Sequence, residues 1–215
     1  MIRFYHFPQR SAQWRIMRLG RWTGSTAIDL LKGKKTPPES NAEYDNKYMQ
    51  RGRILEPLAI EAYEKSICLL GAVKHYGFIT NSKYKHAGYS PDGVLGDTLL
   101  EVKCLNLKGH TQLFDNISAN YMAQIQFGLL ISELPKAILI GYNPDIEETP
   151  TKDMRLFTIE VLPDLAIQAN LIAKLKATEP KRKPSQMRAD KRYIENNPDR
   201  VRESNHKRYL KSKKR

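Results

Sequence analysis

Two carboxylates and one lysine lie close together near the middle of the chain and could support metal-dependent hydrolysis. Asp92 follows Ser90 and Pro91 in a turn-like sequence, and Glu101 and Lys103 come a few residues later. Hydrolysis of a phosphodiester needs a divalent cation to stabilise charge on the phosphate and a deprotonated water to attack it. Mg²⁺ prefers oxygen ligands, so carboxylates must converge on one point. The residue types and their spacing therefore indicate Mg²⁺-dependent phosphodiester hydrolysis.

The element that must position these side chains is a strand over residues 99–105. Side chains alternate along a strand, so Glu101 and Lys103 face one side while Val102 packs on the other. A Gly96-Asp97 turn then folds Asp92 back beside them. The apolar neighbours predict a buried strand, in which Glu and Lys are costly without partners. A plain ion pair between Glu101 and Lys103 is the alternative explanation.

The composition points to a polyanionic partner and excludes several other classes. The chain has 215 residues, with 36 Lys and Arg against 23 Asp and Glu, and a net charge of +13. Such an excess favours nucleic acid or an anionic surface. No long apolar run or secretion signal is present, so we expect no membrane partner and a cytoplasmic protein. The two cysteines and scattered histidines make a structural zinc site improbable.

Alternating helical and strand patterns predict the α/β (α+β) class rather than a helical bundle. Most of the chain, residues 1–178, is expected to form one catalytic domain. We expect Gly52 and Pro57 to divide the third helix into two pieces. The predicted helices are 11–19, one starting near 25, 43–70, 119–131 and 164–177. The predicted strands are 73–80, 87–89, 94–95, 99–105, 136–142 and 154–161, the first four forming a meander.

The last part of the chain, residues 179–215, has a different composition. It contains fourteen Lys or Arg and five Asp or Glu, which is a net charge of +9 out of the total of +13. The sequence Lys191-Arg192-Tyr193-Ile194 recurs as Lys207-Arg208-Tyr209-Leu210. This basic tail, helical or disordered, has two open interpretations, a solubilising arm or an arm that lies on DNA.

Five short motifs occur in a fixed order between about residue 10 and residue 165. They are Trp14-x3-Arg18-Leu19-Gly20-x2-Thr23-Gly24-Ser25, Arg51-Gly52-x3-Glu56-Pro57-x-Ala59, Ser90-Pro91-Asp92-Gly93, Leu100-Glu101-Val102-Lys103-Cys104 and Tyr121-Met122-Ala123-Gln124-Ile125-Gln126. In this order they resemble the phage lambda exonuclease family, the YqaJ-like viral recombinases of the PD-(D/E)xK nuclease superfamily. The resemblance implies a restriction-endonuclease-like core, a central mixed sheet flanked by helices.

The resemblance also implies an activity and partners. Enzymes of this kind degrade one strand of double-stranded DNA from its 5′ end with Mg²⁺, and we expect Mn²⁺ to substitute. The product is a 3′ single-stranded overhang for homologous recombination. A ring-shaped homotrimer and a single-strand annealing protein as partner are further expectations from the resemblance.

Matched motif by motif, the resemblance assigns a catalytic group. Asp92, Glu101 and the Val102 carbonyl would hold the main metal ion. Glu56 would join them from its helix, at the same or a second metal. Lys103 would act on the attacking water. For Glu56, a role in stabilising the amino-terminal dipole of a helix is the alternative.

A second group would grip the 5′-phosphate of the DNA. The resemblance assigns this role to Arg18, Ser25, Ser90 and Gln124. Arginine offers a bidentate fork for phosphate, and hydroxyl and amide groups add neutral donors. The alternatives are that Ser25 caps its helix and that Gln124 is a surface amide.

The chain departs from the family pattern at two positions, and two competing functions remain as alternatives. Gly24 stands where relatives often have alanine, and Leu105 stands where proline is common. The competing functions are a structure-specific endonuclease with the same metal core and a non-catalytic DNA-binding protein.

Overall fold

The computed structural model describes residues 1–38, 47–146, 154–179 and 195–197. Nearly all of the basic tail, including both copies of its repeat, lies outside the described residues. The same holds for the start of the predicted helix at 43–70. The expected division into a catalytic domain and a tail therefore stays a prediction.

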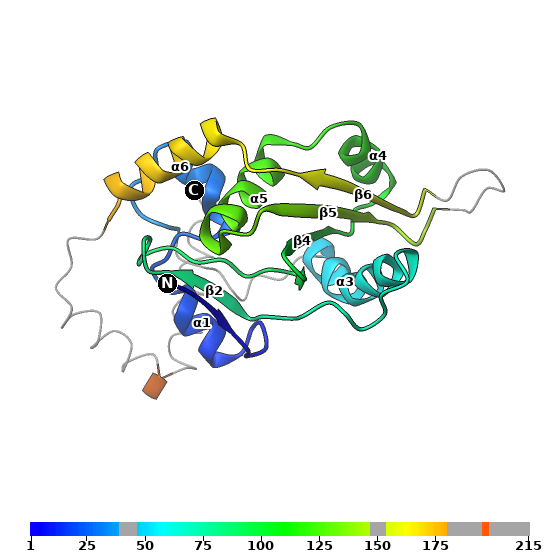
Figure 1. The fold of residues 1–215 in the computed structure, drawn as a ribbon, viewed down its shortest axis with the longest axis horizontal. Coiled ribbons are helices and arrows are strands. Elements are labelled where there is room, and N and C mark those ends of the chain that lie inside the picture. The colour runs from blue at the N-terminus through cyan, green and yellow to red at the C-terminus, as the bar shows by residue number, and fades with distance from the viewer. Residues whose placement is uncertain (39–46, 147–153, 180–194, 198–215) are drawn as a thin grey trace.

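The chain forms a mixed α/β fold, which confirms the predicted class (Figure 1). The helices are α1 (Ala12–Arg18), the 3-10 helix η1 (Gly24–Thr26), α2 (Ala27–Leu31), α3 (Lys47–Ser66), α4 (Leu107–Asp115), α5 (Ala119–Ser132) and α6 (Leu165–Ala177). The strands are β1 (Ile2–Tyr5), β2 (Phe78–Asn81), β3 (Gly93–Leu95), β4 (Thr98–Lys103), β5 (Lys136–Tyr142) and β6 (Leu156–Val161). The sequence patterns had not predicted β1 or α4.

The central sheet has the order β3-β4-β5-β6 and mixes parallel and antiparallel pairs. The strand β4 pairs with β3 as an antiparallel hairpin and with β5 in parallel, so that Glu101 lies opposite Leu139. The parallel pair needs a crossover, and α4 and α5 supply it. The predicted meander is wrong in one respect, because β2 pairs with β1 in a separate two-stranded sheet.

The helix α3 runs without interruption through Gly52 and Pro57, so the predicted break is wrong. A proline inside a helix removes one backbone hydrogen bond and costs about 3 kcal/mol. Packing outweighs this cost, because Ala59, Ile60 and Tyr63 are buried against the central sheet. The unbroken helix places Glu56 one turn before this packed segment.

The two faces of β4 contact different helices. Leu100 and Val102 pack with α3 in one apolar cluster, whereas Leu99 belongs to a larger cluster with α2, α5 and α6. In Figure 1, α3 and the pair α5 and α6 accordingly lie on different sides of the central strands. Glu101 shares the Leu99 face, so it points toward α5. Among the described residues, no helix is apolar and long enough to cross a lipid bilayer.

Candidate active site

The turn before β3 fixes Asp92 beside the end of β4. The side chain of Asp92 accepts a hydrogen bond from the backbone amide of Val102 through Oδ2, at 2.7 Å. The strand β3 pairs with β4 only as far as Leu100. Beyond that point, the carboxylate of Asp92 takes the place of a β3 backbone carbonyl as the hydrogen-bond acceptor for β4. The amide and carbonyl of one strand residue point to the same side. The Val102 carbonyl is therefore directed toward the edge of β4 at which Asp92 lies.

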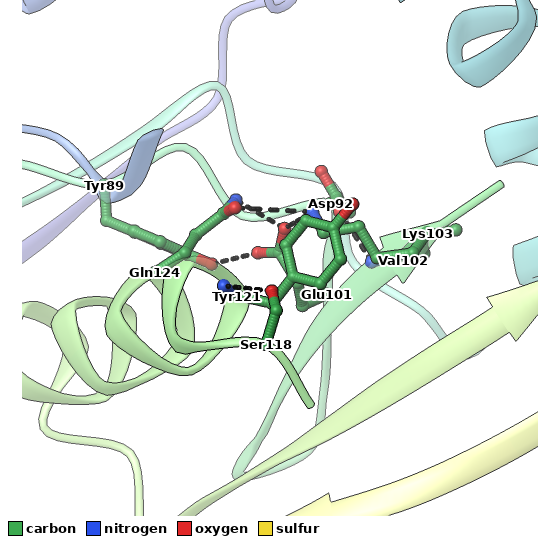
Figure 2. A network of polar contacts seen from close by, with 8 residues as sticks. All are labelled: Tyr89, Asp92, Glu101, Val102, Lys103, Ser118, Tyr121 and Gln124. Atoms are coloured by element: carbon green, nitrogen blue, oxygen red, sulfur yellow. Dashed lines mark hydrogen bonds and ion pairs between the residues drawn. The ribbon is translucent and has the colours of Figure 1, made fainter. Parts of the chain in front are cut away.

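Glu101 is buried, with 1% of its surface exposed, and three side chains bond its carboxylate. The hydroxyl of Tyr89 donates to Oε2, and both Lys103 and the amide of Gln124 donate to Oε1. Figure 2 shows Tyr89 and Gln124 converging on Glu101, with Asp92 and Val102 close by. The carboxylate is thus held on β4 by donors from α5 and from the segment before Ser90.

Lys103 is positioned as a cation. Burial alone would lower the pKa of its ammonium group, but Glu101 and Asp92 outweigh burial and raise that pKa. Its Nζ also lies 5.0 Å from the ring centroid of Tyr121, within the range of a cation–π contact. At neutral pH the side chain therefore donates hydrogen bonds and cannot accept a proton. The ion pair with Glu101, which the alternative explanation required, is present.

Excess negative charge gathers around this lysine. Burial raises the pKa of Asp92 well above its usual value, and Glu101 and Glu56 raise it further. Burial and the charge of Glu101 likewise raise the pKa of Glu56, although Lys103 opposes the shift. The charges of Glu101 and Glu56 both disfavour the ionised form of Asp92, so the three carboxylates lie near one another.

This donor set fits a hard divalent cation. Carboxylate and carbonyl oxygens are the ligands that Mg²⁺ accepts, and a cation would relieve the mutual repulsion of Asp92, Glu56 and Glu101. Within the described residues, no group of three Asp, Glu, His or Cys side chains has the convergent geometry of a ready metal site.

A second polar cluster forms around Arg18. Its Nη1 lies 3.2 Å from the hydroxyl of Ser90, and its Nη2 lies 3.3 Å from the hydroxyl of Ser25 and 3.4 Å from that of Thr23. Trp14 donates to Ser90 at 2.8 Å and stacks beneath the guanidinium at 4.4 Å. Three of the four residues predicted to grip a phosphate therefore lie together.

The guanidinium of Arg18 is half-buried and has no counter-charge among the described residues. No carboxylate of the described chain pairs with it, and its Nε is buried without a hydrogen-bond partner. Burial lowers the pKa of Arg18 to about 10, which still leaves it a cation at neutral pH. A half-buried cation surrounded by neutral hydroxyls would gain a charge-assisted hydrogen bond from an anion that bound beside it.

Two of the alternative explanations for these residues are wrong. Ser25 caps no helix, because its hydroxyl contacts Arg18 and Thr23 while the 3-10 turn is closed by Thr26, whose hydroxyl accepts from the Thr23 amide at 2.9 Å. Glu56 lies in the middle of α3, beyond the first turn in which the helix dipole acts.

The fourth residue predicted to bind phosphate, Gln124, bonds Glu101 and not Arg18. Its half-buried amide is engaged within the site, because it donates to Glu101 and its oxygen lies 3.4 Å from Nζ of Lys103. Its Cγ nevertheless lies near Gly24, next to Ser25. Gln124 thus stands between the two clusters.

Three further residues support the site, and sequence reasoning did not assign them a role. Trp14 and Tyr121 belong to the quoted motifs, and their short spacing to Arg18 and Gln124 within those motifs was the available signal. Tyr89 precedes Ser90 directly. Its isolated bridge to Ile79 orients it, and no local sequence pattern indicates that long-range pairing.

Comparisons with known proteins agree with the fold and the motifs. The chain shares its fold with an alkaline exonuclease from Laribacter hongkongensis, with a TM-score of 0.65 and 23% identity over 89% of this chain and 100% of that one. The same exonuclease in complex with dAMP gives a TM-score of 0.66 and 24% identity over the same shares of each chain. No curated protein matches the chain. The YqaJ-like viral recombinase domain matches residues 13–135, which is more than half of the chain. The chain therefore belongs to the YqaJ-like viral recombinase domain family.

Proposed function

We propose that this protein is a Mg²⁺-dependent exonuclease that degrades one strand of double-stranded DNA from the 5′ end. The observation that carries the proposal is the cluster of Asp92, Glu101 and Lys103 at the end of β4, in a member of this family. The structural likeness to an alkaline exonuclease supports a nuclease in this fold.

In this proposal the side chains divide the chemistry between them. Asp92, Glu101, Glu56 and the Val102 carbonyl would hold Mg²⁺, with Mn²⁺ able to substitute. The cation would stabilise charge on the scissile phosphate and lower the pKa of the attacking water. Lys103, held protonated, orients that water and stabilises the developing negative charge. Tyr89 and Gln124 fix the carboxylate of Glu101.

The polarity of degradation would come from the Arg18 cluster. A terminal 5′-phosphate would supply an anion for the half-buried guanidinium, with Ser25 and Ser90 as neutral partners. Gln124 lies between this cluster and Glu101, so an occupied phosphate pocket would place the first phosphodiester bond near the metal ligands. Degradation from the 5′ end leaves a 3′ single-stranded overhang suited to recombination.

A linear duplex tests this proposal. One strand carries either a 5′-phosphate or a 5′-hydroxyl, and separate labels report loss from the two ends of each strand in Mg²⁺. We expect faster loss of the 5′-phosphorylated strand from its 5′ end. Preferential loss from 3′ ends would contradict the polarity, and cutting of closed circular DNA would favour an endonuclease. Tight DNA binding without cleavage in Mg²⁺ or Mn²⁺ would favour a non-catalytic binding protein.

The assembly and partners rest on the family resemblance. We propose a homotrimeric ring around the DNA, transfer of the 3′ overhang to a single-strand annealing protein, and a cytoplasmic location. The basic tail at 179–215 would act as a separate segment that adds affinity for the DNA backbone.

A further inference from the structure

A cavity of ≈ 560 Å³ opens beside Asp92 and Glu56, and none of the roles above uses it. The segment between β1 and α1 forms one wall and α3 forms another. Glu56 and Asp92 are part of its lining. Whatever occupies the cavity would therefore lie next to the proposed metal ligands.

Two hydrogen bonds join the wall of the cavity to the turn that carries Asp92. The amide of Gln9 donates to the Pro91 carbonyl at 2.8 Å, and Nδ1 of His75 lies 3.3 Å from the Asp92 carbonyl. The cavity is thus built onto the same turn that positions a proposed metal ligand.

Two arginines give the cavity a positive rim. Arg53 and Glu56 are three residues apart on α3, so they share one face of the helix, and Arg10 approaches from the opposite wall. Burial and then repulsion from Arg53 lower the pKa of Arg10, whereas Glu56 raises it. The two guanidinium groups therefore repel each other across the cavity, and an anion bound between them would attract both.

The backbone at Arg10 is an independent sign of a functional position. Arg10 has a φ of 69°, in the left-handed region that favours glycine. Non-glycine residues in that region cost roughly 1 kcal/mol or more and cluster at ligand-binding sites. Glycine would adopt this turn without strain, so an arginine at this position carries a conformational cost.

Aromatic rings form another part of the lining. The rings of His6 and Tyr76 are tilted against each other with centroids 4.6 Å apart, and Phe7 lies on the same segment as His6. Flat apolar rings beside guanidinium groups are the combination that binds a nucleotide, because the rings contact the base or sugar and the arginines contact phosphate.

We propose that this cavity holds the nucleotide on the 3′ side of the scissile bond, with Arg10 and Arg53 on its 3′-phosphate. The inference rests on the proposed function, in which the Arg18 cluster grips the 5′ end. The metal ligands then lie between two phosphate-binding sites, one for the terminal phosphate and one for the phosphate after the bond that is cut. These two phosphate-binding sites would together position the substrate strand beside Asp92 and Glu56.

Neutral methylphosphonate linkages in a 5′-phosphorylated linear duplex test this inference. The second linkage from the 5′ end is the one that Arg10 and Arg53 would contact, and a linkage far inside the duplex serves as the DNA control. Binding is measured by fluorescence anisotropy in EDTA, so that no cleavage occurs. The proteins are the wild type, the double variant Arg10→Ala with Arg53→Ala, and Arg3→Ala, which removes an exposed arginine of β1 outside the cavity. Thermal melting checks that each variant is folded.

For the wild type and for Arg3→Ala, we expect the neutral second linkage to weaken binding roughly five- to tenfold, the size of a lost charge-assisted contact. The double variant should bind the normal duplex more weakly and show no further loss with the neutral linkage. An equal loss in the double variant and the wild type would overturn the inference while leaving the proposed function intact, provided that a 5′-phosphate still strengthens binding. If wild-type binding depends on neither the 5′-phosphate nor the second linkage, the proposed function fails together with the inference.

Discussion

Tyr89 donates its phenolic hydrogen to Oε2 of Glu101. The tyrosine is only 1% exposed and lies outside β4, in the segment that bridges to Ile79. Its ring fits because two glycines face it. An added Cβ at Gly24 would lie 2.5 Å from Cε2 of Tyr89, and one at Gly128 would lie 2.6 Å from its Cζ. Gly24 and Gly128 thus leave the space that the ring of Tyr89 occupies.

Replacing Tyr89 with phenylalanine should slow cleavage of linear duplex about tenfold and raise the Mg²⁺ concentration needed for half-maximal rate. The change keeps the ring and removes the donor, leaving one oxygen of a buried carboxylate unpaired, at a cost of about 1–3 kcal/mol. Initial rates across a Mg²⁺ titration measure the effect, with thermal melting as the check on folding. A variant with wild-type Mg²⁺ dependence would show that Tyr89 does not position Glu101.

The variants Arg18→Ala and Arg18→Lys should both reduce the preference for 5′-phosphorylated ends. Alanine removes the only cation of the cluster, and lysine keeps the charge but lacks the planar fork that reaches Ser25 and Ser90 together. The ratio of initial rates on 5′-phosphate and 5′-hydroxyl duplexes should fall toward one, with alanine the more severe. Cleavage of 5′-hydroxyl ends should change less than about threefold. An unchanged ratio in Arg18→Ala would show that the Arg18 cluster does not recognise the 5′-phosphate.

The stability of the metal-free protein should fall as the pH rises. Burial raises the folded-state pKa values of Asp92 and Glu56, so the folded protein holds these protons more tightly than the unfolded chain. Raising the pH through the folded pKa values then ionises repelling, buried carboxylates and lowers the free energy of unfolding. Mg²⁺ should therefore raise Tm more at about pH 8 than at about pH 5. An equal Mg²⁺ effect at both pH values would indicate that these carboxylates do not bind it.

Deleting residues 179–215 should weaken duplex binding and flatten its dependence on salt. The tail carries a net charge of +9, and each phosphate contact that is lost removes about 0.9 from the slope of log K against log salt concentration. Anisotropy titrations at several salt concentrations measure both quantities. If the slope is unchanged, the tail does not lie on DNA.

The sequence predicted the parts of the fold that depend on local patterns. The alternation across Glu101, Val102 and Lys103 placed two of these side chains on one face of a strand, as the structure shows. The predicted break at Pro57 was wrong, because the tendency of proline to interrupt a helix is a local property, whereas the packing of α3 on the sheet is a long-range one. It also missed β1, whose four residues become a strand only by pairing with β2, about 75 residues later.

In the site, too, residues within short motifs could be predicted from the sequence, whereas contacts between distant residues could not. The motifs identified Asp92 and Arg18 by residue type and order, and the structure adds that Arg18 has no counter-charge among the described residues. The role of Tyr89 depends on its bridge to Ile79 and on space left by Gly24 and Gly128. No pattern within a short stretch of sequence contains that information.

The most direct test of the account is release of nucleotides from a 5′-phosphorylated linear duplex by the wild type, Asp92→Asn and Lys103→Ala. We expect release by the wild type in Mg²⁺ and none in EDTA. Each variant should lose at least about a thousandfold in rate, because each removes a group that acts on the transition state. Both variants should still bind the duplex. Cleavage at the wild-type rate by either variant, or no cleavage by the wild type in Mg²⁺ or Mn²⁺, would contradict the account.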